Sequence, residues 1–230
     1  MRTVKEFDSP CVHPNGLQWA GDELLVMDQK TDDVFVMDAG GDVKRRIPTP
    51  TENGSGIASG GGFIWTASNG KTAVRPPRPS DTGLGWVLKL DPESGEMVDR
   101  FRTPDGGGVH GLEWDDGNIW VTGFNPLALH LVDGDTFRVL ATFPVKLPRL
   151  HGLAREGEGI WCAHTGDRLI VKYAVEDGSE LDRITFGAED AFPHGLSIRG
   201  GELWYCDADY RVAGFEGTWR GWPEIGRVVA

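Results

Sequence analysis

Short apolar runs separated by turn residues extend along the whole chain, and no stretch shows a helical period of useful length. The runs are rich in β-branched and aromatic residues, and Asp-Gly, Ser-Gly or Gly-Gly turns join them, as in strands connected by hairpins. One kind of run, with Trp in four of five copies, covers residues 24–27, 64–67, 119–122, 160–163 and 203–206. The first four copies are followed by paired runs at 34–38 and 43–47, 86–91 and 97–101, 129–133 and 139–143, and 170–173 and 181–186. The pattern predicts an all-β protein.

The tripeptide His-Gly-Leu marks a repeat along the same chain. It begins at His110, His151 and His194, and related tripeptides begin at Asn15 and Ser55. The interval is 40 residues from Asn15 to Ser55, 41 from His110 to His151 and 43 from His151 to His194. A period of that length is one supersecondary unit and is typical of propellers or solenoids.

Five such units of four strands each predict a single-domain, five-bladed β-propeller of antiparallel blades. The predicted blades span approximately residues 13–50, 52–104, 107–145, 148–189, and 191–230 together with 3–8. The fifth unit has no clear outer strand after residues 212–215, and segment 3–8 matches the outer-strand pattern. We therefore expect the N-terminal strand to close the ring, which would remove exposed sheet edges. Residues 225–229 are an alternative for the same place.

One interval departs from the period, since 55 residues separate Ser55 from His110. The surplus lies at residues 70–85, which include the sequence Arg-Pro-Pro-Arg-Pro from Arg75. A loop that lengthens in one repeat is usually functional on the face where it emerges. We expect this insertion to act as a lid.

Composition narrows the class of protein. The 230 residues carry a formal net charge of −12, which argues against nucleic acid or an acidic membrane as partner and leaves a small-molecule substrate. No apolar run approaches the ~20 residues that span a bilayer, and the N-terminus has no apolar signal core, so we expect a cytoplasmic protein. The three cysteines, Cys11, Cys162 and Cys206, lack CxxC spacing and are expected to be free thiols.

Candidate chemistry follows from the repeat. Equivalent positions at the start of the innermost strands would form a ring around the channel mouth, consisting of Asn15, Ser55, His110, His151 and His194. The ends of the second strands return to the same face and would form a second ring, consisting of Asp28, Ser68, Gly123, His164 and Asp207. Two polar rings are therefore predicted at one mouth of the channel.

Three neutral imidazoles converging from His110, His151 and His194 would leave the opposite side of a metal open to water or substrate. We therefore predict a divalent transition metal, zinc or iron above all, held by these three histidines. Such a metal acts as a Lewis acid or lowers the pKa of bound water to about 7. The alternative is structural, because a turn residue that is Asn, Ser or His can hydrogen-bond a neighbouring backbone carbonyl.

Further residues are candidates for substrate binding and proton transfer. A base must lie within hydrogen-bond reach of the reacting group, and the candidates near the mouth are His164, Asp207 and Tyr210. A carboxylate of the substrate could be held bidentately by arginine, so the predicted substrate-binding residues are Arg149, Arg75, Asn15, Ser55 and Asp28.

The run Pro193-His194-Gly195-Leu196, followed by a Gly-Gly turn and Leu203-Trp204, resembles the repeat of streptogramin (virginiamycin B) lyase-like propellers, within the wider group of gluconolactonase-like and NHL-type proteins. The resemblance implies a metal-assisted elimination, in which a cation polarises a carbonyl and a histidine removes a proton. Those lyases have seven blades, whereas this chain has length for five. Five-bladed plant-type glutaminyl cyclases carry a Phe-Thr-Gln-Gly-Leu signature that is absent here.

The three-histidine arrangement is also similar to the lyase domain of peptide-amidating enzymes, a propeller with zinc held by three histidines. That resemblance implies that His110, His151 and His194 are the ligands. The sequence thus predicts a metal-dependent lyase acting on a small organic molecule. A metal-dependent hydrolase of lactones or esters on the same site, and a non-catalytic propeller that binds a ligand or protein, are the alternatives.

Overall fold

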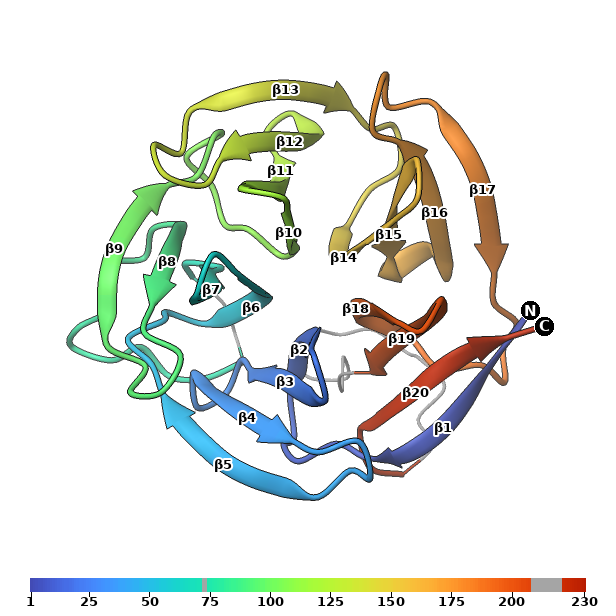
Figure 1. The fold of residues 1–230 in the computed structure, drawn as a ribbon, viewed down its shortest axis with the longest axis horizontal. Coiled ribbons are helices and arrows are strands. Elements are labelled where there is room, and N and C mark those ends of the chain that lie inside the picture. Colours follow the sequence, from blue (N-terminus) through green and yellow to red (C-terminus); the bar gives the residue numbers. More distant parts are fainter. Residues whose placement is uncertain (72–73, 208–220) are drawn as a thin grey trace.

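A computed structural model, which describes residues 1–71, 74–207 and 221–230, contains five four-stranded antiparallel sheets arranged in a ring (Figure 1). The five-bladed propeller predicted from the repeat is therefore confirmed. Beside the strands, the described residues include one short 3-10 turn, η1 (Thr165–Asp167).

The first four blades each take four consecutive strands of the chain, ordered from the axis outward. Blade 1 consists of β2 (Pro14–Ala20), β3 (Glu23–Asp28), β4 (Asp33–Met37) and β5 (Val43–Pro48). Blade 2 consists of β6 (Gly54–Gly60), β7 (Phe63–Ser68), β8 (Trp86–Leu90) and β9 (Met97–Arg102). Blade 3 consists of β10 (Leu112–Asp115), β11 (Asn118–Phe124), β12 (Leu127–Asp133) and β13 (Val139–Pro144). Blade 4 consists of β14 (Leu150–Glu156), β15 (Gly159–His164), β16 (Leu169–Ala174) and β17 (Glu180–Thr185).

Blade 5 joins the two ends of the chain. From the axis outward it contains β18 (Pro193–Arg199), β19 (Glu202–Asp207), β20 (Glu224–Val229) and β1 (Arg2–Asp8). The N-terminal strand pairs antiparallel with β20, and both termini lie side by side at the outer edge of this blade (Figure 1). Closure by the N-terminal strand is confirmed. Residues 225–229 do not compete with it, because they belong to the third strand; the run at 212–215 lies outside the described residues.

The glycine of each repeated tripeptide is explained by close packing around the axis. A Cβ atom on Gly111 would collide with the carbonyl of His151, and one on Gly152 would collide with the backbone at 194–196 of the next blade. The same holds for the glycines of the other three tripeptides, Gly16, Gly56 and Gly195. Neighbouring inner strands therefore approach backbone to backbone, which only glycine allows at this position.

The hydrophobic core lies between adjacent blades. The Trp of the second strand packs there, with Trp65 and Trp120 fully buried. Across the closing seam, Trp19 of blade 1 meets Trp204 of blade 5 edge to face, with ring centroids 5.1 Å apart. The three cysteines are buried free thiols, as predicted. Among the described residues, no helix is long and apolar enough to cross a membrane.

A histidine cluster at the propeller axis as the candidate site

The three histidines of the repeat meet at the axis. His151 and His194 are the second residues of the inner strands β14 and β18, and His110 lies just before β10. The ring centroids of His110 and His151 are 4.5 Å apart, and those of His151 and His194 are 4.3 Å apart, both edge to face. Phe124 packs against the other side of His110, 4.8 Å away. The predicted convergence of three imidazoles is therefore observed.

Hydrogen bonds between blades hold the backbone of this ring. In each case a side chain of one blade donates to the carbonyl just before a ring residue of the next blade. Ser55 donates to Val109, the Thr165 hydroxyl donates to Pro193 over 2.8 Å, and the Cys206 thiol donates to Pro14 over 3.5 Å. The seams between blades 2 and 3, 4 and 5, and 5 and 1 thus position His110, His194 and Asn15 from behind.

The protonation pattern of His151 follows from one of these bonds. Its Nδ1 lies 2.8 Å from the Thr165 hydroxyl oxygen. Because the single hydroxyl hydrogen of Thr165 is given to the Pro193 carbonyl, Nδ1 of His151 must be the donor. Neutral His151 therefore carries its lone pair on Nε2, the type of atom that binds a metal or accepts a proton.

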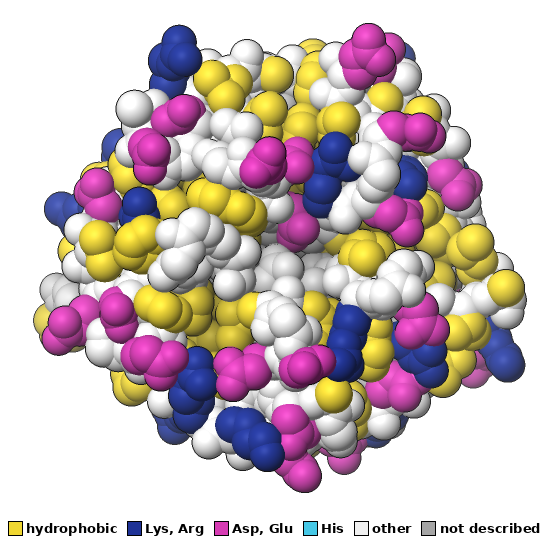
Figure 2. Space-filling model, viewed as in Figure 1, with side chains coloured by type: hydrophobic (Ala, Val, Ile, Leu, Met, Phe, Trp, Pro, Cys, Tyr) yellow, Lys and Arg dark blue, Asp and Glu magenta, His cyan; other side chains and the backbone are white. Residues whose placement is uncertain are grey.

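Burial keeps all three imidazoles neutral. Desolvation lowers the pKa of His110 to about 4, although part of its surface stays exposed. For His151 and His194 the pKa is well below its usual value, first because both rings are buried and second because neighbouring imidazoles disfavour a further positive charge. Figure 2 shows one face of the molecule, with basic and acidic side chains mixed around its rim and no histidine in view.

Whether the cluster suits a metal can be tested on its donor atoms. Neutral imidazoles are the right ligands for zinc or iron, and the Thr165 bond to His151 is the kind of outer contact that orients a metal-binding ring. Nδ1 of His110 is buried without a hydrogen-bond partner. The donor chemistry fits. Within the described part of the chain, however, no three His, Cys, Asp or Glu side chains are arranged to hold a metal ion, so the metal site is not confirmed.

The second ring is mostly occupied with structural bonds. Asp28 accepts bonds from the Lys30 and Thr31 amides and from the Thr31 hydroxyl, and so caps the turn after β3. Asp207, at the end of β19, lies opposite Pro193 in the sheet and accepts a bond from the Phe192 amide over 3.3 Å.

His164 is fully buried at the end of β15, and both of its ring nitrogens are hydrogen-bonded. Nδ1 donates to the Pro148 carbonyl over 3.1 Å, so Nε2 accepts from the Tyr173 hydroxyl over 2.9 Å. Tyr173 belongs to β16, away from the axis. Proton transfer by His164 would require the bond to Tyr173 to break. Tyr210, the third predicted proton-transfer residue, lies outside the described residues.

Among the predicted substrate-binding residues, Asn15 is buried and its Oδ1 has no hydrogen-bond partner. Ser55 also lies in the ring, but its hydroxyl is used between blades. Arg149 is exposed, adjoins Gly166 of η1 and lies near enough to His151 to disfavour its charged form. It has a left-handed backbone conformation, with φ of 56°.

Arg75 has a different role from the one predicted. Its guanidinium binds Asp81 bidentately over 2.7 and 2.9 Å and Asp32 over 2.9 Å, with the side chain only 4% exposed. The carboxylates of buried Asp32 and half-buried Asp81 therefore occupy the group that was expected to hold a substrate carboxylate. Together with Glu52, which accepts bonds from the backbone of Thr82 and Gly83, these contacts fasten the insertion to the junction of blades 1 and 2. Its role as a lid stays a prediction.

Sequence reasoning missed Thr165. Thr165 follows the second strand of blade 4 and has no counterpart in the repeat that would single it out. For Glu113, a possible ligand or base next to the first His-Gly-Leu, strand alternation predicts a side chain turned away from His110 but not how deeply its carboxyl is buried. Glu113 follows the first His-Gly-Leu; it is buried, its Oε1 accepts a bond from the Arg155 amide of the next blade, and its Oε2 has no hydrogen-bond partner. Desolvation raises the pKa of Glu113 to about 8.

Comparison with known proteins identifies the class of fold. No protein-family model and no curated protein sequence matches the chain. Among solved structures, the glutaminyl cyclase of Myxococcus xanthus superposes with a TM-score of 0.69 at 12% sequence identity, covering 98% of this chain and 94% of that one. The chain is thus a β-propeller whose fold is similar to that of a glutaminyl cyclase.

Two further structures share the fold at lower similarity. Virginiamycin B lyase from Staphylococcus aureus gives a TM-score of 0.55 at 16% identity, covering 96% of this chain and 67% of that one. The computationally designed Ika8 protein gives 0.50 at 11% identity, and this chain spans 57% of its length. The resemblance to the streptogramin lyase propellers therefore holds at the level of the fold.

Proposed function

We propose that the axial histidine cluster is the active site of a lyase that acts on a small organic molecule. The observation that carries this proposal is the contact of three imidazoles kept neutral by burial at one point of the axis. Neutral imidazoles carry a nitrogen lone pair each, so their convergence brings metal-ligating and proton-accepting groups to one place. The fold neighbours supply only the precedent that propellers of this kind carry enzymes, because function belongs to the site and not to the fold.

A divalent transition metal, zinc or iron, is the proposed cofactor, with His110, His151 and His194 as the residues that would hold it. When bound, it would supply Lewis acidity towards a carbonyl of the substrate. The donor set supports this assignment. Because the described side chains as they stand do not form a metal-binding group, the rings would have to turn about their side-chain bonds to bind the ion. His151 is already oriented by Thr165 and presents Nε2.

The remaining roles belong to residues around the cluster. Asp207 is the better placed of the described proton-transfer candidates, because it is partly exposed and lies opposite Pro193, next to His194. His164 is the weaker candidate, since both of its nitrogens are engaged. Arg149, exposed beside η1, is the cation that would hold an anionic group of the substrate, and Asn15 offers an unsatisfied oxygen to a substrate donor.

Metal content of the purified protein tests the proposal directly. Elemental analysis of protein prepared without added metal and without an affinity tag of histidines is compared among wild type, His151→Ala and His130→Ala. His130 is a matched control, because it is also buried but lies on β12 and bonds Thr142. We expect near-stoichiometric zinc or iron that is lost in His151→Ala and kept in His130→Ala.

Product analysis then separates the reaction classes. Lactones and esters with a leaving group β to the carbonyl are screened, because elimination yields an unsaturated product and hydrolysis yields an acid and an alcohol. An unsaturated product supports the lyase. Absence of metal, of turnover and of any thermal shift on adding zinc or iron would instead favour a propeller that only binds ligands.

A further inference from the structure

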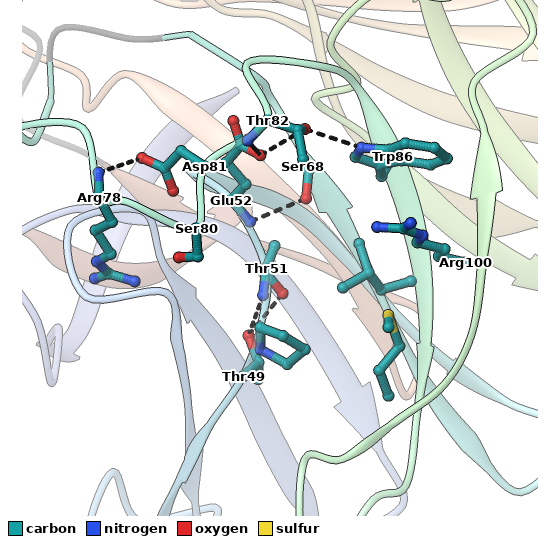
Figure 3. Close-up of a pocket in the computed structure, with 13 residues that line it drawn as sticks. Thr49, Thr51, Glu52, Ser68, Arg78, Ser80, Asp81, Thr82, Trp86 and Arg100 are labelled. Atoms are coloured by element: carbon teal, nitrogen blue, oxygen red, sulfur yellow. Dashed lines mark hydrogen bonds between the residues drawn. The ribbon is translucent and has the colours of Figure 1, made fainter.

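A cavity of about 270 Å³ lies at the junction of blades 1 and 2, away from the histidine cluster (Figure 3). One wall is the connection between β5 and β6, a second is the insertion, and the third is the outer half of blade 2. None of the five ring residues lines it. In size it suits a small ligand, below the usual range for drug-sized molecules.

The carboxylates in the walls of this cavity are already engaged. Glu52 accepts bonds from the Thr82 amide and hydroxyl over 2.7 and 2.9 Å and from the Gly83 amide. Asp81 is paired with Arg75, and Arg78 is paired with Asp32 over 2.8 Å. These side chains form the wall, and each of their charges is bound by an ion-pair or hydrogen-bond partner within the protein.

The opposite wall carries Arg100, a cation without such a partner, and Arg102 lies next to it on the same strand. Arg100 and Arg102 alternate along β9 and so share the face of Trp86, which pairs with Arg102 in the sheet. Their guanidinium carbons lie 4.6 and 4.8 Å from the Trp86 ring, a cation–π arrangement that orders both side chains. Within the described chain neither guanidinium forms an ion pair, although the whole protein carries a net charge of −12.

Comparison with other blades indicates that the fold does not require an arginine at this position to lack an ion-pair partner. Arg46 of blade 1 and Arg183 of blade 4 occupy the register position of Arg100 on their outer strands. Arg46 is paired with Asp33, and Arg183 is paired with Glu180 over 2.7 Å. Of the three arginines at this position, Arg100 at the cavity is the one that pairs with no carboxylate in the described part of the chain.

The other lining residues indicate what kind of ligand would bind beside Arg100. Met97, Leu88 and Pro50 provide apolar surface, and Trp86, whose ring nitrogen donates to the Thr82 hydroxyl over 3.1 Å, provides an aromatic edge. Ser80, which belongs to the insertion, adds a hydroxyl to the lining. A planar guanidinium fork beside apolar walls matches an oxyanion attached to an apolar body.

We propose that this cavity is a second ligand site, which binds a small organic oxyanion, a carboxylate or a phosphate ester, with its charged group on Arg100 and its apolar body against Met97 and Leu88. Arg102 supports the site from the same Trp86 ring. The insertion then forms a wall of this site. The proposal stands on residues separate from the histidine cluster and does not depend on the function of that cluster.

Titrations followed by NMR test the site. The ¹⁵N-labelled protein is titrated with phenylacetate, with phenyl phosphate and with the neutral 2-phenylethanol, and the ring N–H of Trp86, assigned through Trp86→Phe, reports on the cavity. We expect a saturable shift with at least one of the two anions, and at least about tenfold weaker binding of 2-phenylethanol. The anion that binds more tightly tells a carboxylate ligand from a phosphate ester.

Two variants supply the control. Arg100→Gln should weaken anion binding by about tenfold or more, whereas Arg183→Gln, at the same register position of blade 4, should leave it unchanged. Because both side chains are exposed, both variants should melt at the wild-type temperature. The absence of a saturable shift with either anion, or equal anion binding by Arg100→Gln, would overturn the proposal.

Discussion

Nδ1 of His151 lies 2.8 Å from the hydroxyl of Thr165, and the same hydroxyl donates over 2.8 Å to the carbonyl of Pro193 in the next blade. One side chain therefore sets the tautomer of the central histidine and also ties blade 4 to the backbone that presents His194. The orientation of the cluster is thus coupled to the packing of two blades.

Replacing Thr165 by valine should uncouple the orientation of His151 from the packing of blades 4 and 5. Thr165→Val keeps the shape but removes the acceptor, so His151 can take either tautomer, and zinc affinity should fall by roughly 10- to 100-fold, as for other outer contacts of metal-binding histidines. Isothermal titration with zinc measures the affinity, and ¹⁵N chemical shifts of the ring report the tautomer. Thr165→Ser, which keeps the hydroxyl, should restore both; an unchanged tautomer in Thr165→Val would show that the bond is not decisive.

The neutral histidines should make the fold sensitive to acid. The pKa of His110 is about 4 in the folded protein and near 6.5 when unfolded, so its contribution is present above pH 6.5 and is lost as the pH falls towards 4. Each such histidine adds up to about 1.4 kcal/mol per pH unit to the slope of the unfolding free energy. Urea unfolding of His110→Gln between pH 4.5 and 7 should give a shallower slope than wild type. An identical slope would mean that His110 protonates in the folded state.

Glu113 should change the pH dependence of stability in the opposite direction to His110. Its pKa is raised from 4.5 to about 8, so its contribution is full below pH 4.5 and is lost as the pH rises to about 8. Glu113→Gln keeps the acceptor for the Arg155 amide and cannot ionise, so it should raise the unfolding free energy at pH 8.5 by a few kcal/mol. At pH 4.5 the variant and wild type should be nearly equal. Urea titrations at the two pH values test this, and a variant less stable than wild type at pH 8.5 would contradict it.

The anchor of the insertion should be expensive to break. Arg75→Met leaves Asp32, which is fully buried, with only Arg78 as an ion-pair partner, and removes the bidentate partner of Asp81. Loss of one partner of a buried ion pair costs roughly 3–5 kcal/mol, which a urea titration detects. The matched surface variant Lys44→Met, which breaks an exposed pair with Asp38, should lower the unfolding free energy far less. Equal losses of unfolding free energy in the two variants would contradict a structural role for Arg75.

The sequence alone determined the architecture. Recurring tripeptides about 41 residues apart, a Trp in the second strand and turn residues between short apolar runs specify five similar units, and similar units that each have an unsatisfied face pack into a ring. The same repeat placed His110, His151 and His194 at equivalent positions, so their convergence followed from the symmetry of the fold. The N-terminal strand was predictable because it matched the pattern of the missing outer strand, whereas the tertiary structure decided that residues 225–229 form the third strand instead.

Tertiary structure decided what each polar side chain does within that ring. The pairing of Arg75 with Asp32, the hydrogen bond from Nδ1 of His151 to Thr165, and the position of Arg100 over Trp86 all depend on side chains that the repeat does not relate to one another. A periodic pattern reports which face of a strand is buried, and it therefore predicts the fold. Hydrogen bonds and ion pairs depend on distances of a few tenths of an ångström between side chains far apart in sequence, and only the folded chain sets those distances.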